Sequence, residues 1–156
     1  MPKRSAGLLL FRRPSRGLEV LLVHPGGPFW ARKDLGAWSV PKGEYGDTED
    51  PRAVALREFE EETGARPHGE LLPLGQVTQP GRKVVIAWAT EGDFDPHSLV
   101  SNTFELEWPP RSGRKRSFPE VDRAEWFSIE DARRRILPGQ RDFIERLVAT
   151  LGAQMS

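Results

Sequence analysis

The 156-residue sequence contains no cysteine, which excludes disulfide bonds and thiolate metal sites. Basic and acidic residues number 23 each, so no net charge points to nucleic acid or an anionic membrane as a partner. The histidines at 24, 68 and 97 lack the spacing of a zinc site. The apolar run Leu8 to Phe11 is too short for a signal peptide or a membrane span. We therefore expect a cytoplasmic protein without membrane attachment or stable nucleic-acid binding.

The length of the chain predicts a single domain over residues 1–156, with residues 152–156 frayed. Apolar runs and alternation predict strands over residues 5–11, 18–24, 38–40, 71–78, 83–90, 103–108 and 124–127. Helical patterns cover residues 51–63, 129–137 and 140–151, whereas the segment 109–119, with its basic run RSGRKR, is expected to be a loop. Strands interspersed with helices indicate an α/β domain whose helices pack on a mixed sheet.

The most informative segment runs from Gly43 to Ala65 and reads GEYGDTEDPRAVALREFEEETGA. Asp50 suits the N-cap of a helix, and Pro51 suits the first helical position, where its missing N–H costs nothing. Gly64 is suited to end the helix in the left-handed conformation. The segment therefore predicts a loop, one helix and a glycine stop.

Glu58, Glu61 and Glu62 share one face of this helix, because residues three and four positions apart are neighbours. They lie in the last two turns, where the helix dipole is negative and each carboxylate costs about 0.3–1 kcal/mol. Arg57 offsets part of this cost if it reaches Glu60 or Glu61. A divalent metal would relieve the rest, and a solvated acidic face is the alternative reading.

The spacing of Gly43, Glu49 and the run from Arg57 to Ala65 resembles the Nudix box, a glycine, a glutamate and REUxEExGU in which U is apolar. The resemblance implies the Nudix fold, an α/β/α sandwich around a central mixed sheet. It also implies a hydrolase that cleaves a nucleoside diphosphate linked to another moiety by attack of water on phosphorus. Nucleoside triphosphates, dinucleoside polyphosphates and nucleotide sugars are the implied substrates. The alternative is a non-catalytic Nudix domain that binds a nucleotide or a protein partner.

The subgroup that the sequence resembles is that of small bacterial diadenosine polyphosphate and nucleoside triphosphate pyrophosphohydrolases. A tyrosine downstream of the box is frequent in the dinucleoside polyphosphate hydrolases, yet the one tyrosine of this chain, Tyr45, lies inside the box. The substrate is therefore left open, and a monomer and a homodimer are both compatible with the sequence.

The resemblance implies that Mg²⁺ or Mn²⁺ is bound by Gly43, through its backbone carbonyl, and by Glu58, Glu61 and Glu62. Arg57 is expected to orient the glutamates. Glu49 is expected to hold the loop against the helix.

The general base varies within the family and is either a box glutamate, here Glu61, or a carboxylate from a later strand or loop. The later candidates are Glu105, Glu107 and Glu120, each of which has an ordinary role as a polar residue on an outer face. Geometry decides between them, and the sequence does not supply it.

Substrate contacts are predicted for Lys42, Trp30 and Arg114. Lys42 directly precedes the box and is suited to contact a phosphate, although a solvated lysine is equally compatible with its position. Trp30, in a loop rich in glycine and proline, offers a surface on which a base can stack, but large aromatic residues are more often part of the core. Arg114 belongs to the basic run, which could meet a polyphosphate but is more often a solvated group of charges.

Overall fold

A six-stranded mixed sheet forms the centre of the computed structural model, which describes the backbone of residues 3–155 and the side chains of residues 3–152. Its strands are β1 (Arg4–Arg12), β2 (Glu19–Pro25), β3 (Lys42–Glu44), β4 (Leu72–Gln79), β5 (Lys83–Glu91) and β8 (Val121–Ser128). The strand order is β4-β5-β1-β2-β8, and β3 pairs with β1 off this path. The β1–β5 pair is parallel and the other pairs are antiparallel, which confirms the predicted mixed sheet.

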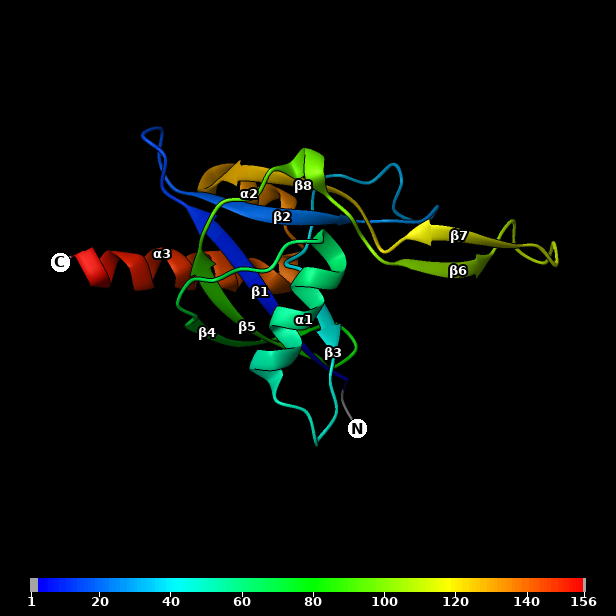
Figure 1. The fold of residues 1–156 in the computed structure, drawn as a ribbon, viewed down its shortest axis with the longest axis horizontal. Helices are drawn as coiled ribbons and strands as arrows, with labels where there is room; N and C mark the ends of the chain where they lie inside the picture. The colour runs from blue at the N-terminus through cyan, green and yellow to red at the C-terminus, as the bar shows by residue number, and fades with distance from the viewer. Residues whose placement is uncertain (1–2, 156) are drawn as a thin grey trace.

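Helices cover both faces of the sheet and complete the predicted α/β/α sandwich (Figure 1). Helix α1 (Pro51–Thr63) lies on one face, and α2 (Ile129–Arg135) and α3 (Arg141–Met155) lie on the other. Two short 3-10 helices, η1 (Pro96–Ser98) and η2 (Pro138–Gln140), lie in the connections. Among the described residues, no helix has the length and apolar character needed to cross a membrane.

Strand β1 buries side chains on both faces because it lies inside the sheet, between the two helical layers. Leu8 packs in the same cluster as Phe59 of α1, whereas its neighbour Leu9 packs in the cluster that contains Ile144 of α3. This division follows from the alternation of side chains along a strand. The central apolar run thus serves two cores and fixes α1 against the sheet.

The bounds of α1 agree with the prediction because local residues set both ends. The carboxylate of Asp50 accepts a hydrogen bond from the backbone N–H of Arg52 at 3.2 Å. Gly64 adopts a φ of 83°, and its N–H donates to the carbonyl of Glu60 at 2.7 Å. These are the N-cap and left-handed C-terminal stop that the sequence indicates.

The prediction of a loop over residues 109–119 is wrong for its last part, because Lys115–Pro119 forms strand β7. It pairs antiparallel with β6 (Thr103–Glu107), and Phe104 lies opposite Phe118. Cross-strand contacts of this kind stabilise a strand whose own sequence is basic and polar. The two strands form a hairpin that extends away from the sandwich (Figure 1), here named the β6–β7 arm.

The predicted strand over residues 38–40 is reduced to two isolated bridges. Ser39 pairs with Val23, and Trp38 pairs with Ile136. These bridges join the segment to β2 and to the residue that follows α2, and the chain then leads into β3.

Smaller differences concern the ends of the later elements. Strand β8 is longer than the predicted segment 124–127, and α2 ends two residues before the predicted 137. The predicted fraying of residues 152–156 falls largely on side chains outside the described range, while the backbone of α3 is helical through Met155.

Candidate active site

Strand β3 and helix α1 meet at Gly43. A Cβ atom placed on this residue would lie 2.1 Å from Cδ of Glu58 and 2.3 Å from its Oε1, far inside van der Waals contact. The absence of a side chain therefore lets the carboxylate of Glu58 lie against the backbone of β3. This steric role is separate from ligation by the Gly43 carbonyl, which stays a prediction.

Arg57 joins the loop before α1 to the glutamates of the helix. Its Nη1 donates to Oε2 of Glu49 at 3.2 Å, while Oε1 of Glu49 accepts from the N–H of Gly46 at 2.9 Å. The same guanidinium lies 3.6 Å from Oε1 of Glu58 and 4.0 Å from Oε1 of Glu61. The Gly46 N–H and Arg57 lower the pKa of Glu49. The guanidinium thus lies within ion-pair distance of two of the three carboxylates, and its role in orienting them stays a prediction.

Glu62 is the most deeply placed carboxylate, with 8% of its surface exposed. Its Oε2 accepts from the backbone N–H of Lys42 at 3.2 Å. Burial, and then the charge of Glu58, raise the pKa of Glu62 to about 8. Burial and the charge of Glu61 likewise raise the pKa of Glu58, and burial lowers that of Lys42. The site thus concentrates more negative charge than its own cations neutralise.

Glu120 reaches the same site through a series of backbone hydrogen bonds that starts at the end of α1. The Asn102 N–H donates to the Glu61 carbonyl at 2.9 Å, and the Glu120 N–H donates to the Asn102 carbonyl at 2.8 Å. The Gly26 N–H then donates to the Glu120 carbonyl at 2.9 Å. The charge of Glu120 contributes to the raised pKa of Glu62. Of the later base candidates, this one faces the box.

A cleft of about 600 Å³ opens beside these carboxylates. Its charged lining consists of Lys42, Glu62, Lys83 and Glu120. Its apolar lining includes Val23, Pro25, Trp30, Pro80, Leu137 and Pro138. Trp30 is half-buried and packs against the core as well as lining the cleft. The structure therefore brings the predicted Lys42 and Trp30 together with Glu62.

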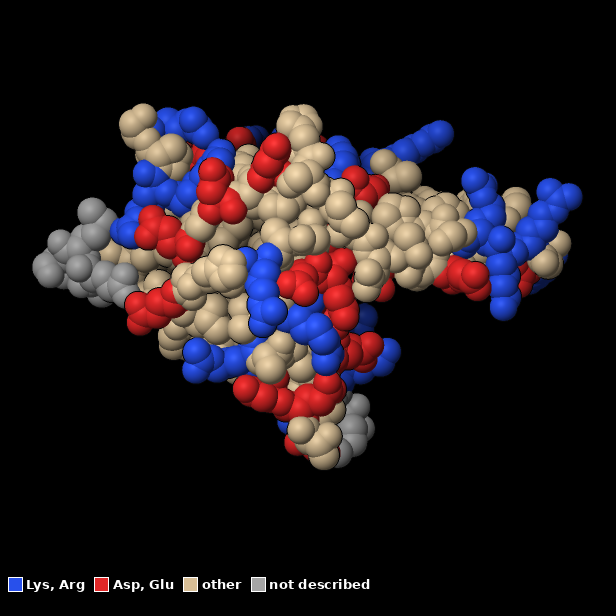
Figure 2. All heavy atoms as spheres, in the orientation of Figure 1, with Lys and Arg blue, Asp and Glu red and all other residues tan. Residues whose placement is uncertain are grey.

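Three other predicted residues lie on the β6–β7 arm. Glu105, Glu107 and Arg114 are exposed, and Figure 2 shows basic side chains gathered at the tip of the arm with acidic ones nearer the body. Oε1 of Glu107 accepts from the N–H of Gly113 at 3.2 Å, within the arm itself. Among residues 3–152, none of the three lines the cleft or forms an ion pair with a box glutamate.

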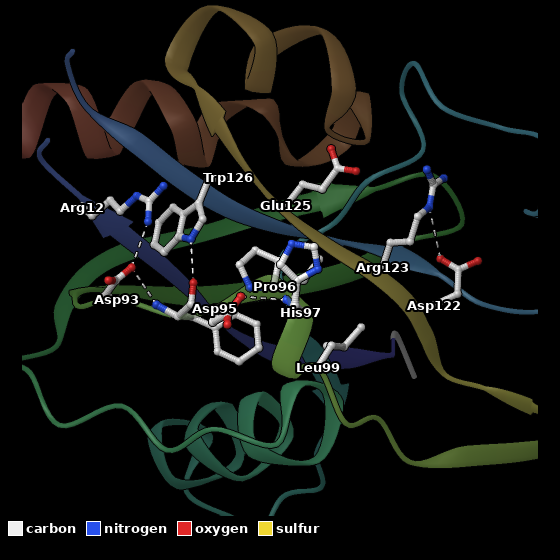
Figure 3. A pocket seen from close by; sticks show the side chains of 12 residues that line it. Arg12, Asp93, Asp95, Pro96, His97, Leu99, Asp122, Arg123, Glu125 and Trp126 are labelled. Carbon is white, nitrogen blue, oxygen red and sulfur yellow. Dashed lines mark hydrogen bonds and ion pairs between the residues drawn. The ribbon is translucent and has the colours of Figure 1, made fainter.

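A larger cavity, of about 840 Å³, lies between β8 and the segment around η1 (Figure 3). Arg12 forms an ion pair with Asp93 at 2.9 Å and lies 4.1 Å above the ring of Trp126. The indole N–H of Trp126 donates to the Phe94 carbonyl, and Asp95 caps η1. Several polar groups that line this cavity are thus already paired with one another in hydrogen bonds or ion pairs. No glutamate of the box lines it, so we place the candidate active site in the smaller cleft.

Sequence reasoning missed three residues of the cleft region, Lys83, Gln79 and Gln140. Lys83 and Gln79 line the cleft, and the charge of Lys83 contributes to the lowered pKa of Lys42. Gln140 is fully buried beneath it. These residues come from two strand ends and the 3-10 helix η2, far from the box in the sequence, and no local motif marks them.

The residues of the site suit a hard divalent cation. Among the described side chains, no three acidic or histidine groups stand close enough to hold an ion by themselves. Mg²⁺, however, keeps several waters and is commonly held by one or two carboxylates together with substrate phosphates. The carboxylates of Glu58 and Glu62 are ligands of this kind, and the pKa of each is raised by burial and by a neighbouring carboxylate, Glu61 for Glu58 and Glu58 for Glu62.

The α/β/α sandwich and the glutamate-bearing helix define the class of the Nudix hydrolases, enzymes that act on phosphoric anhydride bonds. The family model of the NUDIX domain matches residues 1–147, and the chain belongs to this family. No curated protein matches the chain.

Three solved structures illustrate the fold. A binary complex of the Ap4A hydrolase of C. elegans gives a TM-score of 0.68 at 20% identity and covers 96% of this chain and 98% of that one. The NUDIX domain of Shewanella oneidensis NrtR, complexed with ADP ribose, gives 0.67 at 19% identity over 97% and 89%. The C-terminal domain of mouse MUTYH, in complex with human PCNA, gives 0.63 at 19% identity over 97% and 91%. Similarity at this level of identity shows the fold.

Proposed function

We propose that the protein is a Mg²⁺- or Mn²⁺-dependent pyrophosphohydrolase that cleaves a nucleoside diphosphate linked to another moiety. One observation carries the proposal: the box glutamate Glu62 lies in the wall of a cleft that also presents Lys42, Lys83 and Glu120. The carboxylates are not fully neutralised by nearby cations and are suited to bind a metal ion. The lysines beside them are suited to bind the phosphate oxygens of a polyphosphate. A nucleoside triphosphate, a dinucleoside polyphosphate and a nucleotide sugar all carry this group.

Phosphoryl transfer depends mainly on positioning and on neutralising phosphate oxygens. In this proposal Glu58, Glu61 and Glu62, with the carbonyl of Gly43, hold the metal. When bound, the metal neutralises phosphate charge and orients the anhydride bond. Arg57 keeps Glu58 and Glu61 in place.

Lys42 and Lys83 bind phosphate oxygens in the proposal. Burial already lowers the pKa of the Lys42 ammonium, and the charges of Glu62, Glu44 and Glu58 favour its charged form. An incoming phosphate adds further negative charge beside it and strengthens the charged form. Trp30 contributes apolar surface for the nucleoside.

We assign the general base to Glu120 in preference to Glu105 and Glu107. Glu120 lines the cleft, and its exposed carboxylate can accept a proton from an attacking water. Glu61 is the alternative within the box, although its carboxylate lies beside Arg57. The base assignment predicts that Glu120→Gln lowers kcat about 10²–10⁴-fold in a steady-state assay.

The function is tested by incubating the protein with ATP, GTP, diadenosine tetraphosphate and ADP-ribose, with and without Mg²⁺. Metal-dependent release of nucleotide products is expected, together with its loss in Glu62→Gln. Glu60→Gln is the matched control, because Glu60 lies in the same helix but is exposed to solvent. The same panel is run with Mn²⁺, and absence of turnover with either metal would refute the proposal.

A second candidate function is binding without turnover. Two neighbours supply the observation, since NrtR is complexed with ADP ribose and the MUTYH domain with PCNA. Nucleotide binding in Mg²⁺ without product release would favour this reading. The undamaged box and the cleft beside it favour the enzyme.

A further inference from the structure

A buried glutamine is held in one orientation beneath the cleft. Gln140 is fully buried, and its Oε1 accepts from the backbone N–H of Val40 at 3.0 Å. Because a backbone N–H can only donate, this contact requires the oxygen of the Gln140 amide at that position. Its Nε2 donates to Oγ of Ser39 at 3.0 Å and to Oε1 of Gln79 at 3.2 Å.

The orientation of the Gln140 amide determines that of the Gln79 amide. Since Nε2 of Gln140 can only donate, the group of Gln79 that meets it is the carbonyl oxygen, and the amide NH₂ of Gln79 points elsewhere. Among residues 3–152, Nε2 of Gln79 has no hydrogen-bond partner, and it is not among the buried atoms that lack one. Gln79 lines the cleft, so its free N–H groups are accessible there.

The backbone near Gln79 is shaped to keep this side chain in place. A Cβ atom on Gly139 would lie 3.0 Å from Cγ of Gln79, so the absence of a side chain lets the glutamine pack closely against the backbone there. Gln79 ends β4, and Pro80 follows it in the lining of the cleft. The donor is therefore fixed from both sides, by Gln140 at its oxygen and by Gly139 at its stem.

We propose that Gln79 determines specificity by donating an amide N–H to an exocyclic carbonyl oxygen of the base bound in this cleft. The inference rests on the proposed function, which places the nucleoside here. A fixed N–H donor forms a hydrogen bond with a base that carries a carbonyl oxygen at the contacted position. It forms none with a base that carries an amino group there, because both groups are donors. The cleft accordingly selects oxo-bearing bases over amino-bearing ones. Apolar walls, which include Trp30 and Pro138, favour a planar ring in either case.

The test is to measure the equilibrium binding of IMP and of AMP by calorimetry in the presence of Mg²⁺. These two nucleotides carry oxygen and an amino group, respectively, at position 6 of the same ring. We expect IMP to bind about tenfold more tightly than AMP, the effect of one neutral hydrogen bond. In Gln79→Glu, the carboxylate still accepts from Gln140 but offers no donor, and the ratio is expected to shift towards AMP about tenfold.

Two further variants separate the roles of charge and shape. Gln76→Glu introduces the same charge on β4 at an exposed position outside the cleft, and its IMP/AMP ratio is expected to equal that of the unaltered protein. Gln79→Leu keeps an apolar side chain of similar length without any N–H, and is expected to abolish the discrimination.

Binding of neither nucleotide, tighter binding of AMP to the unaltered protein, or a ratio insensitive to both Gln79 variants would overturn the inference. IMP and AMP contain no phosphoric anhydride, so this result does not depend on turnover. Discrimination without hydrolysis of the substrate panel would refute the proposed function and leave the inference standing. Hydrolysis without discrimination would do the reverse.

Discussion

Gly43 lies where two elements of the site touch, and the space for its side chain is taken by Glu58. Gly43→Ala forces the helix, the strand or the carboxylate to move, because its Cβ would lie 2.1 Å from Cδ of Glu58. We expect a loss of about 1–3 kcal/mol in the free energy of unfolding, typical of overpacking. Turnover should fall more than stability accounts for, since the displaced group is a proposed ligand. Urea unfolding and a steady-state assay measure the two effects.

Gly46→Ala is the matched control for this substitution. It lies in the loop that follows, and the nearest atom to an added Cβ is Oε1 of Glu49 at 3.9 Å, an ordinary contact distance. Its stability is expected to change by less than about 0.5 kcal/mol. Equal losses in the two variants would contradict the steric role of Gly43.

The raised pKa of Glu62 predicts a pH-dependent stability for the metal-free protein. Its pKa is about 8 in the fold, above the ordinary value of 4.5, so the folded state binds a proton more tightly than the unfolded state. The stabilising proton is fully present below about pH 4.5 and is lost as the pH rises through about 8. The free energy of unfolding should fall across this range, by up to about 1.4 kcal/mol per pH unit. Urea unfolding in EDTA at several pH values measures it.

Glu62→Gln should remove most of this fall, because the amide stays neutral at every pH. Glu60→Gln, at an exposed position two residues earlier, should leave it in place. A slope that survives in Glu62→Gln would assign the pH dependence to other groups.

At the scale of elements, the sequence predicts best where local chemistry decides. Helix α1 has the predicted bounds because Asp50 and Gly64 act within a few residues of themselves. The hairpin of β1 and β2 is likewise confirmed by antiparallel pairing of Phe11 with Val20. Strand β7 was missed because its stability comes from β6, as in the pairing of Phe118 with Phe104, and not from its own polar residues.

The β6–β7 arm should be removable without loss of the site. The N–H of Glu120 donates to the carbonyl of Asn102, so the two ends of the arm already meet. We predict that replacing residues 103–119 by a short glycine linker leaves a folded protein that keeps its metal-dependent turnover. Circular dichroism and the substrate panel test this.

If the deletion variant folds but has lost its activity, Glu105, Glu107 or Arg114 contributes to the reaction. The single variants Glu105→Gln, Glu107→Gln and Arg114→Gln would then identify which of them acts. Each is exposed, so none is expected to change stability by more than about 0.5 kcal/mol.

At the scale of the whole molecule, the site joins segments that are distant in the sequence. The box could be recognised from the sequence because its residues lie in one continuous segment, β3, the loop after it and α1. Glu120, Lys83 and Gln79 reach the same cleft from a turn and two strand ends, and only the packing of the sheet brings them there. The box glutamates could therefore be named from their spacing, and their role as ligands stays a prediction, whereas the later base candidates could be named but not ranked.

Metal binding should stabilise the whole fold in a pH-dependent way. A ligand that binds the folded state at 100 times its Kd adds about 2.7 kcal/mol to the free energy of unfolding. Because Glu62 must release its proton to bind a cation, Mg²⁺ should raise Tm more at about pH 8 than at about pH 6. Thermal unfolding with Mg²⁺, and with NaCl at equal ionic strength, measures the difference.

Equal shifts with Mg²⁺ and NaCl would show that general screening, and not a specific site, accounts for the effect. Glu62→Gln should lose the specific part of the shift, and Glu60→Gln should retain it.

The positions of two tryptophans give the protein a pair of intrinsic optical probes. Trp30 lines the cleft and lies beneath the Lys33 ammonium, 5.0 Å from its ring centroid, so its emission should respond when a ligand displaces water there. Trp38 is 1% exposed and packs edge-on against His24 and Phe127, so its emission should change only when the core opens. The chain has five tryptophans, so the signal of Trp30 would be taken as the difference between the emission of the unaltered protein and that of Trp30→Phe. That difference would follow occupancy of the cleft, while the change in total emission on unfolding would include Trp38.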